Sequence, residues 1–199
     1  MDSDSPAPPS HLFVYGTLRP AYARMAGSSA AMTPPTALHE AGRHLGEATL
    51  DGYALIHLGA YPAITAAPPP SRVIGDVYAL PTPPPPELLA TLDAYEGIEP
   101  DLPHPHEYTR EAAVVTLTGN GGGDGSRGGG DGTGESVRVW IYTYAWPTHG
   151  GELVPGGDWL AWVAARAAKG GGPEAAPRGL RYLGGGEGDA TGAGGVGEG

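Results

Sequence analysis

The sequence contains no cysteine, which excludes disulfides, thiolate metal sites and cysteine nucleophiles. Basic residues are also scarce: 11 lysines and arginines stand against 22 aspartates and glutamates, so the net charge is -11. The basic residues form no cluster that could neutralise a run of phosphates. No apolar run approaches the ~18 residues of a membrane span. We therefore expect neither nucleic acid nor a membrane as a partner.

The start of the chain also lacks the features of a targeting segment. Residues 1–5 are acidic, without the basic and apolar regions of a secretory signal or the acid-poor character of a transit peptide. We therefore expect a cytoplasmic protein. A length of 199 residues with 40% hydrophobic content predicts one domain.

Glycine and proline are abundant, at 35 and 22 residues, and this raises the question of disorder. Two segments, 119–134 and 184–199, hold 19 of the 35 glycines. The rest reads as an ordinary globular chain. We predict a disordered leader over residues 1–10, a domain over 11–183 with a glycine-rich insert at 119–134, and a disordered tail over 184–199.

Strands are predicted where β-branched and aromatic residues gather between glycines or prolines. These runs are residues 11–15, 48–52, 53–58, 73–80, 112–117 and 137–144. The last two are expected to form a hairpin around the insert. Residues 140–146 carry four aromatic side chains at strand spacing, which favours a core or sheet face over a base-stacking platform.

Helices are fewer and shorter. Residues 87–97 form the best-defined one, because leucines recur at helical spacing, prolines precede them and Gly97 can cap the end. Asp158 is expected to cap a final helix that reaches Lys169. Residues 21–40 predict short helical pieces, interrupted by Pro34 and Pro35. Because strands do not alternate regularly with helices, the pattern indicates an α+β or barrel-like domain.

Glu96 is the most informative carboxylate. It lies in the last turn of the predicted helix, where the helix dipole disfavours negative charge, and Asp93 on the same face repels it further. If this end is buried, desolvation acts in the same direction and raises the pKa of the Glu96 carboxyl, which suits a general acid/base. From these principles alone, a glutamate at a solvated helix end is the somewhat favoured interpretation.

A second candidate is the turn after the first strand, Val14-Tyr-Gly-Thr-Leu-Arg19. Its backbone N–H groups could bind a carboxylate or a developing oxyanion. Taken alone, Gly16 more simply ends the strand. His104 and His106 have no third partner in sequence, so a pair of loop residues is favoured over a metal site.

Five blocks, in order, resemble the γ-glutamylcyclotransferase-like (AIG2-like) family. They are the strand with Tyr15-Gly-Thr-Leu18, then residues 44–64, 74–78 and 92–97, and finally 108–110 with 139–142. The resemblance covers roughly residues 12–144. It implies an α+β fold, with a small mixed β-barrel of about five to six strands flanked by short helices. It also implies a cavity between the 15–18 turn and Glu96.

Members of this family release 5-oxoproline from γ-glutamyl compounds, through attack of the substrate's own α-amino group. The resemblance implies that Tyr15, Gly16, Thr17 and Leu18 bind the glutamyl portion and that Glu96 is the catalytic acid/base. It implies no metal, no cofactor and no nucleophile from the enzyme. The partner is then a small γ-glutamyl substrate, and the sequence leaves the oligomeric state open.

Residues 99–106, rich in proline and histidine, depart from the family pattern next to Glu96 and leave the choice of substrate open. The leaving group is an amine or an amino acid. The alternative is a catalytically silent ligand-binding or stress-response protein on the same fold, because fold alone does not give function.

Overall fold

The structure is a computed structural model, in which residues 7–26, 36–59, 61–118 and 134–169 are described. Residues 1–6 of the predicted leader, 119–133 of the insert and the whole predicted tail lie outside the described residues. The elements are β1 (His11–Val14), α1 (Pro20–Ala26), α2 (Ala37–Ala41), β2 (Arg43–Asp51), β3 (Tyr53–His57), β4 (Pro62–Ala66), β5 (Arg72–Ala79), α3 (Pro86–Tyr95), β6 (Tyr108–Leu117), β7 (Ser136–Tyr144), β8 (Glu152–Leu153), the 3-10 helix η2 (Pro155–Gly157) and α4 (Trp159–Ala168).

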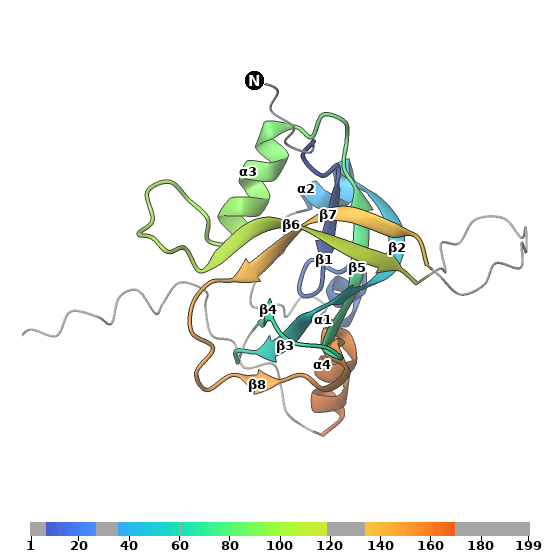
Figure 1. Cartoon of the computed structure of the whole chain (residues 1–199), viewed down its shortest axis with the longest axis vertical. Coiled ribbons are helices and arrows are strands. Elements are labelled where there is room, and N and C mark those ends of the chain that lie inside the picture. Colours follow the sequence, from blue (N-terminus) through green and yellow to red (C-terminus); the bar gives the residue numbers. More distant parts are fainter. Residues whose placement is uncertain (1–6, 27–35, 60, 119–133, 170–199) are drawn as a thin grey trace, which may run out of the picture.

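Five strands close into a barrel in the order β1-β5-β2-β6-β7. Neighbouring strands are antiparallel except β1 and β7, which run parallel and meet at Leu12 and Trp140. A second sheet has the order β4-β3-β8. In Figure 1 this sheet and α4 lie below the barrel, while α3 lies near the top. The predicted α+β fold with a small mixed barrel is confirmed.

The differences from the predicted strands have local causes. β2 begins at Arg43, five residues before the predicted start. Its pairing with β5 shifts register between His44 and Gly46, so the sequence pattern is interrupted there. Gly46 has a φ of 126°, so this glycine marks a bulge inside the strand. The strand β4 was not predicted. It opens on a proline, a residue that sheets tolerate at the first position of a strand.

The helices follow their sequence signals. α3 begins at a proline, with Leu88 and Leu92 as its buried residues. Asp158 caps α4 by accepting hydrogen bonds from the backbone N–H groups of Leu160 and Ala161, at 3.0 and 3.4 Å. The short helices α1 and α2 fall within the predicted 21–40 region, apart from Pro20 and Ala41, while Pro34 and Pro35 are outside the described residues. None of the described helices is long and apolar enough to span a membrane.

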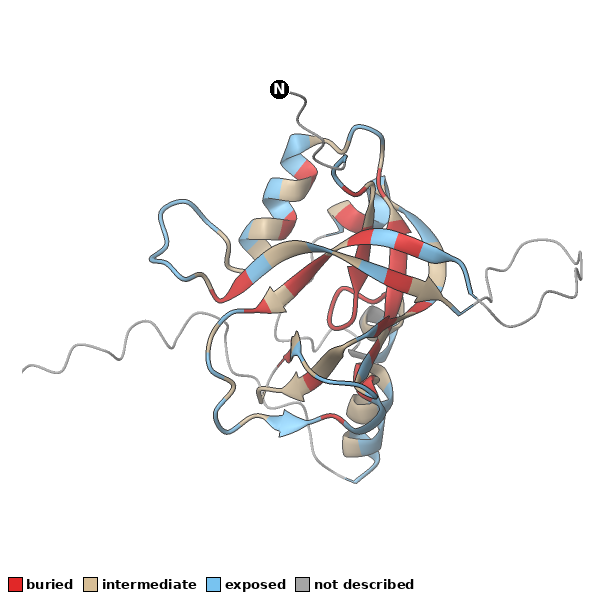
Figure 2. Ribbon diagram, viewed as in Figure 1, coloured by how far each residue is buried: buried red, intermediate tan, exposed pale blue. Residues whose placement is uncertain are grey.

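Two apolar clusters form the core, and β1 contributes to both. Side chains alternate along a strand, so Phe13 packs in one cluster while Leu12 and Val14 pack in the other. The first cluster also holds Trp159 of α4. The second holds the buried leucines of α2 and α3 and the predicted aromatic residues of β7, Tyr142 and Tyr144, with Trp140 and Trp146 packed beside them. Figure 2 shows buried residues concentrated in the barrel strands.

The hairpin of β6 and β7 gives the first prediction. Thr116 pairs with Ser136, and the N–H of Leu117 donates to the carbonyl of Glu135 at 2.9 Å, so the two strands are still in register where the insert begins. Replacing residues 119–133 with Asn-Gly should leave the free energy of unfolding unchanged or higher. Each halving of a loop's length saves about 0.6 kcal/mol of closure entropy. Denaturant unfolding checks this. A loss of cooperative unfolding would contradict it.

Candidate active site

One pocket brings together all five residues that the sequence singled out. It is lined by the turn residues Tyr15, Gly16, Thr17 and Leu18, by Glu96, and by Phe13, Val14, Pro62 and Tyr142. Its empty space is about 310 Å³, part of which is open to solvent. The turn and Glu96 are about 80 residues apart in sequence, and they meet because α3 packs against the barrel beside the end of β1. The pocket therefore lies where the resemblance implied a cavity.

The turn is held rigidly from within. The N–H of Arg19 donates to the carbonyl of Gly16 at 3.0 Å, and the side chains of Thr17 and Leu18 are buried. Gly16 is required by a close approach to β4, because a β-carbon built there would lie 2.5 Å from Pro62 Cγ. Any side chain at position 16 therefore meets Pro62 before it meets a ligand.

Glu96 stands at the C-cap of α3, immediately after the last helical residue. Gly97 has a φ of 73°, and its N–H donates to the carbonyl of Ala94 at 3.1 Å. The N–H of Ile98 donates to the carbonyl of Asp93 at 2.8 Å. This is the pattern of a Schellman motif, which satisfies the last carbonyls of the helix. Only 6% of Glu96 is exposed, so the interpretation as a solvated helix end is wrong.

A hydrogen bond ties the turn to the end of α3. Thr17 Oγ1 and the hydroxyl of Tyr95 are 2.8 Å apart, and Tyr95 directly precedes Glu96. This contact sets the spacing between the carboxylate and the turn. This contact was not predicted from the sequence, because its only signal is a tyrosine at the helix end and the partner of that tyrosine is 78 residues away.

At the pocket wall, the hydroxyl of Tyr142 donates to Asp93 Oδ1 at 2.8 Å, and the carbonyl of Tyr142 accepts a hydrogen bond from the hydroxyl of Tyr15, also at 2.8 Å. Burial raises the pKa of the Tyr142 phenol, and the Asp93 carboxylate raises it further. The phenol therefore stays protonated and remains a donor throughout the neutral pH range.

The same carboxylate has a cationic partner. Arg110 Nη1 lies 3.1 Å from Asp93 Oδ1, and both side chains are largely buried. From the sequence alone, Asp93 is expected to act on Glu96 only by repulsion. The ion pair with Arg110 offsets part of that repulsion. The only sequence signal for this pair is that Arg110 belongs to the block Tyr108-Thr-Arg110.

The two histidines of the 99–106 stretch lie in the loop between α3 and β6, with ring centroids 4.2 Å apart. Neither lines the pocket. Among the residues that the structure describes, no group of three or more histidine, aspartate or glutamate side chains is placed to hold a metal ion.

The contact between Gly16 and Pro62 gives the second prediction. Gly16→Ala should lower the free energy of unfolding by about 1–3 kcal/mol, because an overpacked site must distort to hold the added methyl group. In a Pro62→Ala background the cost should shrink, since alanine lacks Cγ and Cδ and the remaining Cβ is 3.9 Å from the built β-carbon. Chemical denaturation of the four proteins measures this coupling. Equal costs in both backgrounds would contradict the packing explanation.

Several solved structures resemble this one. The chain is 18% identical to YkqA from Bacillus subtilis, with a TM-score of 0.50, over 81% of this chain and 43% of that one. It is 26% identical to ytfP from Escherichia coli, with a TM-score of 0.43, over 75% and 96% of the two chains. A structure described as gamma-glutamyl cyclotransferase is 14% identical, with a TM-score of 0.39, over 73% and 71%. The likeness to YkqA shows a shared fold, although this chain spans less than half of YkqA. No curated protein sequence matches the chain.

The sequence itself matches a family over most of its length. The match is to the family described as Gamma-glutamyl cyclotransferase, AIG2-like, and it runs over residues 12–161. That span contains the whole barrel apart from the first residue of β1, the pocket with Glu96, and the first residues of α4. The chain therefore belongs to the gamma-glutamyl cyclotransferase, AIG2-like family.

Proposed function

We propose that this protein is an enzyme that releases 5-oxoproline from a γ-glutamyl amine or a γ-glutamyl amino acid. The observation that carries the proposal is the pocket, in which a buried carboxylate, Glu96, and the turn of residues 15–18 line the same small space. Membership of the family supports the same reaction class.

The reaction joins two groups of the glutamyl portion, the α-amino nitrogen and the γ-carbonyl carbon. The α-ammonium group, with a reference pKa of about 8, first loses a proton to Glu96. The amine nitrogen then attacks the γ-carbonyl carbon, forming the C–N bond of the five-membered ring and a tetrahedral oxyanion. When the bond to the leaving amine breaks, Glu96 returns its proton to that nitrogen. The attacking nitrogen gives up its second proton to the leaving amine as well, so the ring keeps one N–H and the amine departs as an ammonium group. The products are 5-oxoproline and a free amine or amino acid.

Holding the substrate in a curled form provides much of the catalysis. Correct orientation of an intramolecular attack can lower the barrier by roughly 7–11 kcal/mol. The pocket walls suit this role, because Phe13, Val14, Leu18 and Pro62 are apolar. We infer that backbone N–H groups of the turn provide the donors. Donors aimed at the developing oxyanion stabilise the transition state without reorganisation.

The hydroxyl groups around the pocket are already engaged. The phenol of Tyr15 donates to the carbonyl of Tyr142, and the hydroxyl of Thr17 shares a hydrogen bond with the hydroxyl of Tyr95. We infer that Tyr15 meets the substrate through its ring and that Thr17 meets it through its backbone N–H.

Incubation of the purified protein with a panel of γ-glutamyl amines and γ-glutamyl amino acids, with 5-oxoproline as the measured product, tests the reaction and identifies the leaving group. Binding of 5-oxoproline without turnover of any member of the panel would favour the alternative, a silent ligand-binding protein. If the protein neither binds 5-oxoproline nor turns over any member of the panel, both interpretations of the pocket are contradicted.

Glu96→Gln is the variant that tests the acid/base. Glutamine keeps the size of the side chain but cannot accept the α-ammonium proton, so kcat should fall by about 10²–10⁴. Binding of 5-oxoproline should largely survive. The free energy of unfolding should hold or rise slightly, because a negative charge leaves the negative end of a helix. Steady-state kinetics, calorimetric binding and denaturant unfolding measure the three effects.

Asp93→Asn is the matched control. Asparagine can still accept the hydrogen bond from Tyr142, while the charge that faces Arg110 is lost. Its kcat should fall much less than that of Glu96→Gln. If Asp93→Asn is inactive and Glu96→Gln is active, the assignment of the acid/base is reversed.

Tyr95→Phe tests the spacing between Glu96 and the turn. The change removes one hydroxyl and leaves Thr17 without that partner, so kcat should fall about tenfold, the equivalent of one hydrogen bond of roughly 1.4 kcal/mol in the transition state. Steady-state kinetics measures the loss. A variant with unchanged kcat would mean that the Thr17 contact serves folding alone.

A further inference from the structure

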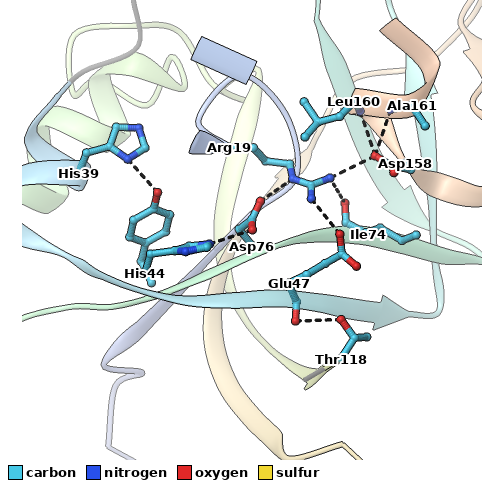
Figure 3. A network of polar contacts seen from close by, with 11 residues as sticks. Arg19, His39, His44, Glu47, Ile74, Asp76, Thr118, Asp158, Leu160 and Ala161 are labelled. Carbon is cyan, nitrogen blue, oxygen red and sulfur yellow. Dashed lines mark hydrogen bonds and ion pairs between the residues drawn. The ribbon is translucent and has the colours of Figure 1, made fainter. Parts of the chain in front are cut away.

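A second polar cluster is centred on Arg19, the residue that closes the turn. Arg19 is 4% exposed, and its guanidinium contacts three carboxylates, as Figure 3 shows. Its Nε lies 2.6 Å from Asp76 Oδ2 in β5, its Nη1 lies 3.1 Å from Asp158 Oδ1 at the start of α4, and its Nη2 lies 3.3 Å from Glu47 Oε2 in β2. Nη1 also approaches the carbonyl of Ile74 at 3.5 Å. One side chain therefore joins three elements of the fold to the turn.

Only arginine can make this junction. Its planar fork directs N–H donors from three nitrogen atoms, whereas a lysine ammonium is a compact point charge. A buried guanidinium is costly unless its donors are satisfied, and here each of the three nitrogens has an oxygen partner. Asp76 is held in turn by His44 Nε2, at 2.9 Å. The arrangement fixes the direction in which Arg19 leaves the backbone.

The backbone of Arg19 carries this restraint into the pocket. Its N–H closes the turn on the carbonyl of Gly16, and its carbonyl accepts the N–H of Tyr22 in α1, both at 3.0 Å. The turn is thus anchored at two places: at Thr17 by Tyr95 beside Glu96, and at Arg19 by the carboxylates. Asp158 also caps α4, which couples the position of the final helix to the same point.

We propose that Arg19 is a positioning residue for the substrate-binding turn, with Asp76 and Asp158 as the partners that hold it. The proposal rests on the proposed function. When the ion pairs are lost, the turn samples conformations that do not bind substrate, and the apparent dissociation constant rises by the inverse of the competent fraction. Saturating substrate selects the competent turn again. Loss of the ion pairs should therefore raise KM and the dissociation constant of 5-oxoproline, while kcat is largely kept.

Arg19→Lys and Asp158→Asn test this on the full chain. Arg19→Lys should raise KM about tenfold or more, the factor expected when a hydrogen bond to a charged group is lost, while kcat stays within about threefold. Asp158→Asn should raise KM less, because asparagine still caps α4 and Arg19 keeps Asp76 and Glu47. The second variant also covers the case in which Arg19→Lys does not fold. Arg166→Gln in α4 is the control, since it breaks an exposed ion pair with Glu152 of β8 and should leave KM unchanged.

Hydrogen exchange of the free protein separates this inference from the proposed function. The amides of residues 16–19 should exchange faster in both test variants, while those of the barrel strands do not. Faster exchange throughout the barrel, unchanged exchange at the turn, or a fall in kcat with KM unaltered would each overturn the proposal. If the wild-type protein turns over no γ-glutamyl compound, the proposed function fails, and exchange at the turn still decides whether Arg19 positions it.

Discussion

The candidate site depends on the burial of one helix end against the barrel. α3 places Leu88 and Leu92 in the second core cluster, and this packing brings its last residues to the turn that follows β1. The Schellman motif at Gly97 satisfies the helix carbonyls, so the end can be buried without leaving backbone groups unpaired. Glu96 is carried into the interior at that point, as the residue between the helix and its capping glycine. A carboxylate there is unfavourable for the fold, which is common for groups that serve chemistry.

The turn is rigid because several independent contacts restrain it. Pro62 blocks any side chain at position 16, Tyr95 holds Thr17, and three carboxylates hold Arg19. Each contact comes from a different part of the chain, so the turn is set by the whole fold and not by its own sequence. This is the preorganisation that transition-state stabilisation by backbone donors requires, because donors that must reorganise contribute little.

The sequence predicted those parts of the fold that carry local signals. The preceding prolines, the leucine spacing and the capping glycine located α3 and hence Glu96. The N-cap aspartate Asp158 located α4. β4 was missed because proline opens it, and the true start of β2 was hidden behind the bulge at Gly46. The pairings of Tyr95 with Thr17 and of Arg110 with Asp93 join residues far apart in the chain. Only tertiary packing creates them, so periodicity and capping rules do not reach them.

The central claim is that the space between the 15–18 turn and Glu96 is where the glutamyl group is held. A crystal structure of the protein with 5-oxoproline bound tests it most directly. The account predicts the ring in this pocket, with an oxygen of the product accepting hydrogen bonds from N–H groups of the turn and the ring amide near the Glu96 carboxylate. Density for 5-oxoproline at another place on the molecule, with this pocket left to water, would contradict the account.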